Sequence, residues 1–269
     1  MTYSQVSTYL YSFINYENLH QYSYKESFKL NRFRAFLKIL GDPQGDLKII
    51  HVAGSKGKGS VCVFIAYMLK QANLKVGLYT SPHLIDFRER IRILQNSKAK
   101  RQSPGEFEGM ISRQDICRLV KSLKPKIDKF DKNSRYGGLT FFEVYTALAL
   151  QYFKESGLDL VVSETGLGGR LDATNACSSI LSVITPVSLE HTYLLGKSLK
   201  QIAYEKASII KKENQRDDRG KAIALSARQD RAVSGVIEKI CRRQDVLLFK
   251  EGSDFSYHKK DSGCFDYQG

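Results

Sequence analysis

The sequence predicts a doubly wound α/β fold with a mostly parallel sheet and a phosphate-binding loop. Three observations predict it. The segments expected to form strands are almost entirely apolar, as strands buried on both faces are. They alternate with longer segments in which apolar residues recur at helical spacing. A glycine-rich turn, residues 54–60, joins the first of these strands to the next helix. We therefore expect helices on both faces of the sheet and an anion site at that turn.

The elements can be assigned in chain order from these patterns. About the first 45 residues are helical and aromatic-rich, with an amphipathic helix at residues 27–40 that the turn residues 41–46 end. The apolar runs that predict strands are residues 47–53, 75–81, 158–165, 179–185, 221–227 and 246–249. The periodic segments that predict helices are residues 59–72, 139–156, 198–212 and 228–244.

Two segments fit this alternation less well. Residues 94–137 are polar and contain glycines, and we expect a flexible or partly helical insertion there. Residues 252–269 are strand-like up to the last residue. A chain that stops within such a pattern is compatible with an incomplete domain.

Length and composition exclude several classes of protein. The 269 residues, 42% of them hydrophobic, can bury a full core in one large domain or two small ones. No apolar run is long enough to span a membrane and no signal peptide is visible, so we expect a cytosolic protein with no membrane partner. The five cysteines are widely spaced and include no CxxC pair, which disfavours a disulfide framework or a zinc site.

The chain is strongly basic, with a formal net charge of +14 and a pI near 9.5. Such a charge attracts polyanions, including nucleotides, polyglutamates and nucleic acid. The basic clusters are scattered and mixed with acids, and no nucleic-acid-binding motif accompanies them. We expect a solvated surface and no nucleic-acid partner.

Residues 54–60 carry the strongest local signal for chemistry. Glycines after a strand let backbone N–H groups turn towards an anion at a helix N-terminus, and Lys58 would add a positive charge. The spacing departs from the strict P-loop pattern, because two residues separate Gly54 from Gly57 and Gly59 follows Lys58. From this segment alone, a glycine-rich turn without a ligand stays open.

Polar residues follow three other expected strands. They are Ser81, Glu164 and His191. Each alone could be a turn serine, a surface glutamate or a histidine with a structural partner. Because ligands collect beyond the carboxyl ends of parallel strands, the three together indicate a divalent-ion site. Oxygen ligands suit Mg²⁺, and the histidine is a less usual ligand for it.

Five longer motifs follow one another along the chain. They are "HVAGSKGKGS", "GLYTSPHLIDFRERIRI", "LTFFEVYTALALQYF", "VSETGLGGRLDATNA" and "LSVITPVSLEHTYLLGKSLKQIAYEKASIIK". In order and in spacing they resemble the motifs of the folylpolyglutamate synthase and dihydrofolate synthase family, within the Mur ligase superfamily. The resemblance covers roughly residues 25–250 and implies the fold of the Mur ligase central domain.

The resemblance also implies a reaction: ATP-dependent joining of L-glutamate to a folate γ-carboxylate or to dihydropteroate, through an acyl phosphate. The implied ATP site is Gly54, Ser55, Lys56, Gly57, Lys58, Gly59 and Ser60. The implied ligands for Mg²⁺, at two sites, include Ser81, Glu164 and His191, and Lys206 is the lysine that the family carbamylates. The implied contributors to the pteroyl site are Thr140, Arg170 and Asp172. We expect small-molecule substrates only and a monomer.

The sequence also departs from the family pattern. The changed positions are Ser55, Lys56, Ser163, Thr165, Pro186 and Glu190. Family members continue into a second, Rossmann-like domain that binds glutamate, and its motifs do not occur in the 269 residues. We therefore expect weak or absent ligase activity from these residues alone. The alternative is a shortened module that binds Mg-ATP and a pterin without completing the ligation.

Overall fold

The computed structural model describes residues 1–19, 22–96, 106–212, 222–260 and 264–269. Its main sheet has seven strands, β1 (Ile49–Ala53), β2 (Val76–Tyr79), β3 (Ile91–Leu94), β4 (Leu160–Glu164), β5 (Leu181–Ile184), β6 (Ala222–Ser226) and β7 (Val246–Lys250). Across the sheet their order is β3-β2-β4-β1-β5-β6-β7. Neighbours are parallel except β2 and β3. The prediction of a mostly parallel sheet is confirmed.

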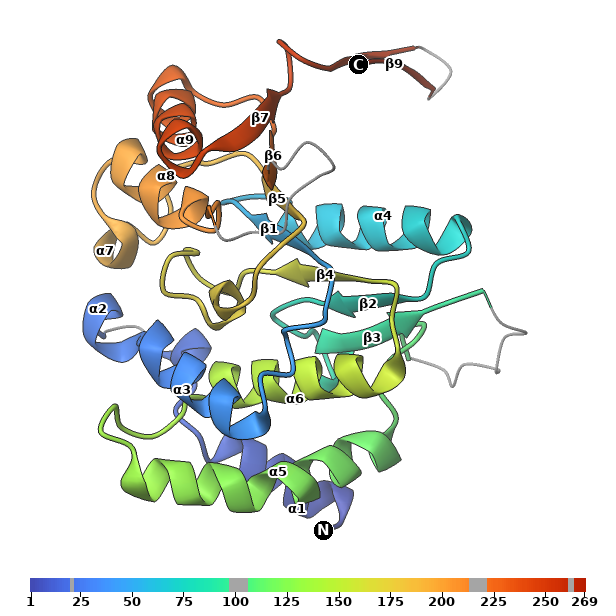
Figure 1. Cartoon of the computed structure of the whole chain (residues 1–269), viewed down its shortest axis with the longest axis vertical. Coiled ribbons are helices and arrows are strands. Elements are labelled where there is room, and N and C mark those ends of the chain that lie inside the picture. Colours follow the sequence, from blue (N-terminus) through green and yellow to red (C-terminus); the bar gives the residue numbers. More distant parts are fainter. Residues whose placement is uncertain (20–21, 97–105, 213–221, 261–263) are drawn as a thin grey trace.

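Helices cover both faces of this sheet (Figure 1). They are α1 (Tyr3–Tyr11), α2 (Tyr24–Ser27), α3 (Leu30–Leu40), α4 (Lys58–Gln71), α5 (Arg113–Asn133), α6 (Phe141–Ser156), α7 (Thr192–Leu195), α8 (Leu199–Ala207) and α9 (Arg231–Gln244). Figure 1 shows α4 on one side of the sheet and α6 on the other, with α5 and α1 beyond α6. Among the described helices, none has both the length and the apolar character needed to cross a membrane.

The alternation of side chains along β1 distributes the core between the two faces. Ile49 belongs to a hydrophobic cluster with residues of α3, α5 and α6, whereas Ile50 and Val52 pack with residues of α4. Successive strand residues point to opposite faces, so both faces of a central strand must be apolar to be buried. This explains why the expected strands read as nearly continuous apolar runs.

The expectation of a flexible or partly helical insertion at residues 94–137 is confirmed in its helical alternative. Their described part contains α5, a 21-residue helix with Pro125 inside it. Its buried residues are Ile116, Leu119, Val120, Leu123, Ile127 and Phe130. This spacing is an amphipathic stripe, which the many lysines on the opposite face conceal when only composition is considered. The expectation for residues 97–105 lies outside the described residues.

The strand β3, at one edge of the sheet, was not predicted from the sequence. β3 pairs with β2 in antiparallel register, Tyr79 opposite Ile91 and Val76 opposite Leu94. A short 3₁₀ helix, η2 (Phe87–Arg90), leads directly into it. At the other end, the strand-like prediction for residues 252–269 is confirmed by the antiparallel pair β8 (Ser256–Lys259) and β9 (Phe265–Gln268).

Candidate active site

The turn from β1 to α4 has a backbone that requires glycine. Gly54 has a φ of +150°, and a Cβ there would lie 1.9 Å from Oγ1 of Thr185 and 2.9 Å from its carbonyl oxygen. The next two amides, of Ser55 and Lys56, both donate to the carbonyl of Pro186. The loop is therefore clamped to the segment that follows β5, the neighbour of β1 in the sheet.

The N-terminus of α4 is open to an anion. Gly57 is its N-cap residue, at a φ of +76°, so no side chain caps the helix and no acidic residue lies in its first turn. The first N–H groups of a helix have no partner within it and carry partial positive charge. Lys58, half-buried, is the first residue of α4. This arrangement can bind a phosphate without any rearrangement of a cap.

The Glu164 carboxylate lies beneath the same turn. A Cβ on Gly59 would be 3.5 Å from Oε2 of Glu164, and that oxygen accepts a 3.0 Å hydrogen bond from the amide of Ser81. Glu164 is buried, and burial raises the pKa of its carboxyl. No hydrogen bond to its other oxygen, Oε1, is present among the described residues. A buried carboxylate with one backbone donor is suited to binding a cation.

Lys206 and Glu190 support the glycine-rich loop, residues 54–60. Nζ of Lys206 donates to the carbonyl of Gly54 at 2.8 Å and to Oε1 of Glu190 at 2.6 Å. Lys206 is 1% exposed, and burial lowers its pKa although the Glu190 carboxylate raises it. The lysine that sequence reasoning alone would place on a helix surface is thus one of the largest fully buried side chains.

His191 follows Glu190 and has a left-handed backbone, with a φ of +45°, at the N-terminus of α7. Burial lowers the pKa of its imidazole, the Glu190 carboxylate raises it, and the positive charges of Lys206, Lys58 and Lys56 lower it, so that the net shift is downward. The neutral ring, which is the form that binds metals, is therefore favoured at neutral pH.

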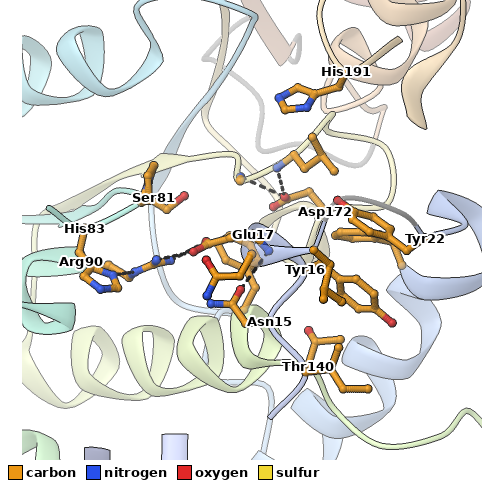
Figure 2. A pocket seen from close by; sticks show the side chains of 18 of the residues that line it. Asn15, Tyr16, Glu17, Tyr22, Ser81, His83, Arg90, Thr140, Asp172 and His191 are labelled. Carbon is orange, nitrogen blue, oxygen red and sulfur yellow. Dashed lines mark hydrogen bonds and ion pairs between the residues drawn. The ribbon is translucent and has the colours of Figure 1, made fainter. Parts of the chain in front are cut away.

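A cavity of about 640 Å³, the first cavity, opens beside these residues (Figure 2). Ser81 and His191 line it, together with Thr140 and Asp172. Its aromatic lining residues are Tyr11, Tyr16, Tyr22, Phe28, Phe142 and Tyr193. Flat aromatic walls with a few polar groups are typical of pockets for planar ring ligands.

Thr140 and Asp172 each have structural partners in this cavity. Thr140 caps α6 through a reciprocal capping box with Glu143. Asp172 is fully buried, and its carboxylate accepts hydrogen bonds from the amides of Gly166, Leu167 and Thr174. It therefore shapes the loop after β4. Arg170 does not line the first cavity; it pairs with Glu205 and lines a neighbouring cavity.

Three hydrogen-bonded residues of the first cavity, Glu17, His83 and Arg90, were not found from the sequence. The guanidinium of Arg90 binds both carboxylate oxygens of Glu17, at 2.8 and 2.6 Å, and donates to Nδ1 of His83 at 2.8 Å (Figure 2). Arg90 is fully buried. Arg90 lies in a charged segment before β3, residues 86–90, and nothing in the sequence distinguishes it from its charged neighbours or links it to Glu17.

The predicted metal ligands are partly brought together. Ser81 and Glu164 are joined by a hydrogen bond, and His191 lines the same cavity as Ser81. Within the part of the chain that the structure describes, no group of three or more His, Cys, Asp or Glu side chains is placed to hold a metal ion. Any cation site here would therefore depend on the serine, and on oxygen atoms supplied by a bound ligand.

The chain is similar in sequence and in structure to several known proteins. The dihydrofolate synthase/folylpolyglutamate synthase of Bacillus subtilis is 40% identical over 184 residues, which are 68% of this chain and 39% of that protein. The folylpolyglutamate synthase of Thermotoga maritima matches with a TM-score of 0.81 and 32% identity, over 99% of this chain and 55% of that one. A folylpolyglutamate synthase complex with AMPPCP and folate matches with a TM-score of 0.80 and 29% identity, over 96% of this chain and 56% of that one. No protein-family model matches the chain.

An uncapped helix behind a glycine-rich loop, at the carboxyl end of a central parallel strand, defines an α/β protein of the phosphate-binding-loop class. Within that class, the chain has the fold of the folylpolyglutamate synthase family, and dihydrofolate synthase/folylpolyglutamate synthases are its homologues. The chain spans about half the length of these relatives.

Proposed function

We propose that the chain takes part in the ATP-dependent ligation of L-glutamate to folate or dihydropteroate through an acyl phosphate. The observation that carries this proposal is the direct connection of the open α4 N-terminus to the first cavity, through Glu164 and the amide of Ser81. The phosphates of ATP would lie at one end of this path. A pterin-bearing substrate would lie in the aromatic cavity at the other end.

The chemistry explains why these two sites must meet. A carboxylate is a poor electrophile until one of its oxygens becomes part of a good leaving group. Transfer of the terminal phosphoryl group of ATP to that oxygen gives an acyl phosphate, and attack by the amine of glutamate then forms the amide and releases phosphate. Phosphoryl transfer relies on positioning and on positive charge around the phosphates. Lys58 and the first amides of α4 would supply both.

Mg²⁺ would be held by Glu164 and Ser81, with His191 at a second position. When bound, it would neutralise charge on the phosphates and polarise the transferred group. The Glu164 carboxylate fits this role because burial already disfavours its charge in the absence of a cation. Pairing with a cation would offset that cost.

Carbamylation of Lys206 belongs to the same proposal. The reaction joins the neutral amine to CO₂ and releases one proton, so it is favoured by a lowered lysine pKa. Burial lowers the pKa of Lys206, as required. The product would be an anion beside Glu190, and two anions in a buried site would in turn favour a bound cation.

Binding measurements on the 269-residue chain test the proposal. We expect calorimetric titration to detect the binding of AMPPCP in the absence of pteroate, and the binding of pteroate in the absence of AMPPCP. Lys58→Ala should weaken the affinity for AMPPCP roughly 10- to 100-fold, because a charge-assisted hydrogen bond is lost. The affinity for pteroate should not change. Lys121→Ala is the control, because Lys121 is exposed on α5, away from the turn between β1 and α4. The proposal would be contradicted if the chain bound neither ligand, or if the two variants weakened AMPPCP binding equally.

Catalysis is tested separately, by phosphate release from ATP. The proposal predicts that release requires both L-glutamate and a pteroate or folate acceptor when the chain acts in its complete enzyme. Release that ignores the acceptor would indicate a simple ATPase instead.

A further inference from the structure

A second cavity, of about 1360 Å³, lies next to the first. Its walls come from segments far apart in the sequence: the start of α3, the residue Tyr136, the loop residue Arg170, and the stretch from α7 into α8. Phe28 and Tyr193 line both cavities, so the two spaces adjoin at these aromatic side chains. A ligand that fills the first cavity can therefore extend into the second.

The second cavity is strongly cationic. Its charged lining residues are Lys29, Arg170, Lys197, Lys200 and Glu205. The only carboxylate among them, that of Glu205, is bound by Arg170 at 2.9 Å. None of the three lysines takes part in an ion pair with another described residue, although Nζ of Lys29 donates to the carbonyl of Tyr136 at 3.4 Å. The cavity therefore has an excess of positive charge that the described residues leave uncompensated.

The helix α8 adds to this field. Its N-terminus faces the cavity, where Lys197 precedes the N-cap residue Ser198 and Lys200 lies in the first turn, which has no acidic residue. A capping box between Ser198 and Gln201 already occupies one of the first amides of this helix. Lysines at a helix N-terminus oppose the helix dipole and cost some helix stability, whereas acidic residues would increase it. An anion bound in the cavity would reverse that cost.

We propose that the second cavity binds the γ-linked glutamate tail of an extended folate, through Lys29, Lys197, Lys200 and Arg170. The inference rests on the proposed function. Each further γ-linked residue adds one α-carboxylate to the substrate, so the tail is a flexible chain of anions. The reacting carboxylate must always reach the phosphate loop, so a longer tail needs room beside the path from the pterin to that loop. The second cavity supplies both the room and the opposite charge.

The test uses two probes that contain no common part. Tetra-γ-glutamate without a pterin reports on the second cavity, and pteroate without glutamate reports on the first. The variant Lys197→Gln/Lys200→Gln removes two exposed charges from the second cavity. The control Lys121→Gln/Lys129→Gln removes two exposed charges from α5, on another face of the molecule.

We expect the first double variant to weaken the affinity for tetra-γ-glutamate roughly fivefold, the effect of losing two exposed ion pairs. Its affinity for pteroate should not change. The same variant should reduce the preference for pteroyl-pentaglutamate over pteroyl-monoglutamate, because only the longer ligand reaches the lysines. The control variant should change neither affinity by more than about twofold.

The outcomes separate the two proposals. Failure of tetra-γ-glutamate to bind, or equal losses in the two double variants, would overturn the tail subsite whatever pteroate does. Binding of tetra-γ-glutamate that depends on Lys197 and Lys200, without any binding of pteroate, would support an anion site and reject the folate function. Both variants alter exposed side chains, and unchanged thermal unfolding would verify that they fold.

Discussion

At the scale of single residues, His51 shows how a buried polar group connects the sheet to the site. It lies in β1 and is 1% exposed, and its Nε2 is 2.8 Å from Oγ1 of Thr174. That hydroxyl donates to Oδ1 of Asp172, so it must accept from His51, which fixes the Nε2–H tautomer. Nδ1 has no hydrogen-bond partner among the described residues. Asp172 then holds the loop that lines the first cavity.

This arrangement predicts a specific sensitivity to acid. Burial, together with the positive charge of Lys211, lowers the pKa of His51 from its ordinary 6.5 to about 3. The unfolded chain therefore takes up a proton on His51 as the pH falls below 6.5, whereas the folded chain does not until about pH 3. Stability should fall across this window, by about 2 kcal/mol between pH 7 and pH 5 from His51 alone.

Urea unfolding at pH 7 and pH 5 measures this effect. In His51→Gln, which retains a donor towards Thr174, the pH dependence should shrink by that amount. His258→Gln is the control, because His258 is exposed. Equal pH dependence of the wild type and His51→Gln would contradict the prediction.

The glycines of the phosphate loop give a second prediction at this scale. Ala at position 54 would place its Cβ against the backbone and hydroxyl of Thr185, and we expect a loss of about 3 kcal/mol or more in the free energy of unfolding. A Cβ at position 57 would meet no atom within 4 Å, so only the left-handed backbone disfavours Ala there. We expect that substitution to lower the free energy of unfolding by about 1–2 kcal/mol. Urea unfolding of Gly54→Ala and Gly57→Ala compares them directly, and equal losses would show that the contact with Thr185 does not matter.

At the scale of elements, a buried ion pair fixes the N-terminus of α6 against α3. Arg32 binds Glu143 at 2.9 Å, and both side chains are 7% exposed. Burial raises the pKa of Glu143 in spite of Arg32. Glu143 also accepts from the amide of Thr140, which lines the first cavity. The pair thus links helix packing to the position of a candidate substrate-binding residue.

We expect Arg32→Met to lower the free energy of unfolding by about 3–5 kcal/mol, because it leaves the Glu143 carboxylate buried without a counter-ion. Adding Glu143→Gln removes that charge and keeps an oxygen for the amide of Thr140. The double variant Arg32→Met/Glu143→Gln should therefore recover much of the loss, as measured by urea unfolding. A double variant less stable than Arg32→Met would indicate that the hydrogen bonds of Glu143, rather than its charge, dominate.

Elements differ in how well their sequences predict them. The strand β1 and the helix α4 were predicted within two residues, because their apolar periodicity is set by burial on the sheet. The strand β3 was missed: it is four residues long, and Arg92 within it is an unusual residue for a buried strand. That arginine is accommodated by the carbonyl of Glu108 and the hydroxyl of Tyr67, contacts that no local pattern shows.

At the scale of the whole molecule, three hydrophobic clusters meet at the central strands. One joins α1, α3, α5 and α6 to a face of the sheet, one lies under α8 and α9, and one lies under α4. The phosphate loop follows β1, the strand that contributes residues to all three. A ligand bound at this loop should therefore stabilise the fold as a unit.

Ligand binding and stability are then linked. AMPPCP at about 100 times its Kd should raise the free energy of unfolding by about 2.7 kcal/mol, since it binds only the folded chain. With Lys58→Ala at the same AMPPCP concentration, a Kd weakened 10- to 100-fold leaves only about 0.4–1.4 kcal/mol. Urea titrations with and without AMPPCP provide the comparison. An increase that is the same in both proteins would place the nucleotide elsewhere.

The sequence by itself determined the fold class, the glycine-rich turn after β1, and the positions of Ser81 and Glu164 at the ends of β2 and β4, whereas His191 lies beyond β5, at the N-terminus of α7. These features follow from local hydrophobic periodicity and from glycines at positions with backbone conformations that other residues rarely adopt. Only the tertiary structure decided which distant residues meet. Glu17 and Arg90, 73 residues apart, close one side of the first cavity, and Arg170 pairs with Glu205 beside a second one. Such pairs depend on how helices pack on the sheet, which no short stretch of sequence specifies.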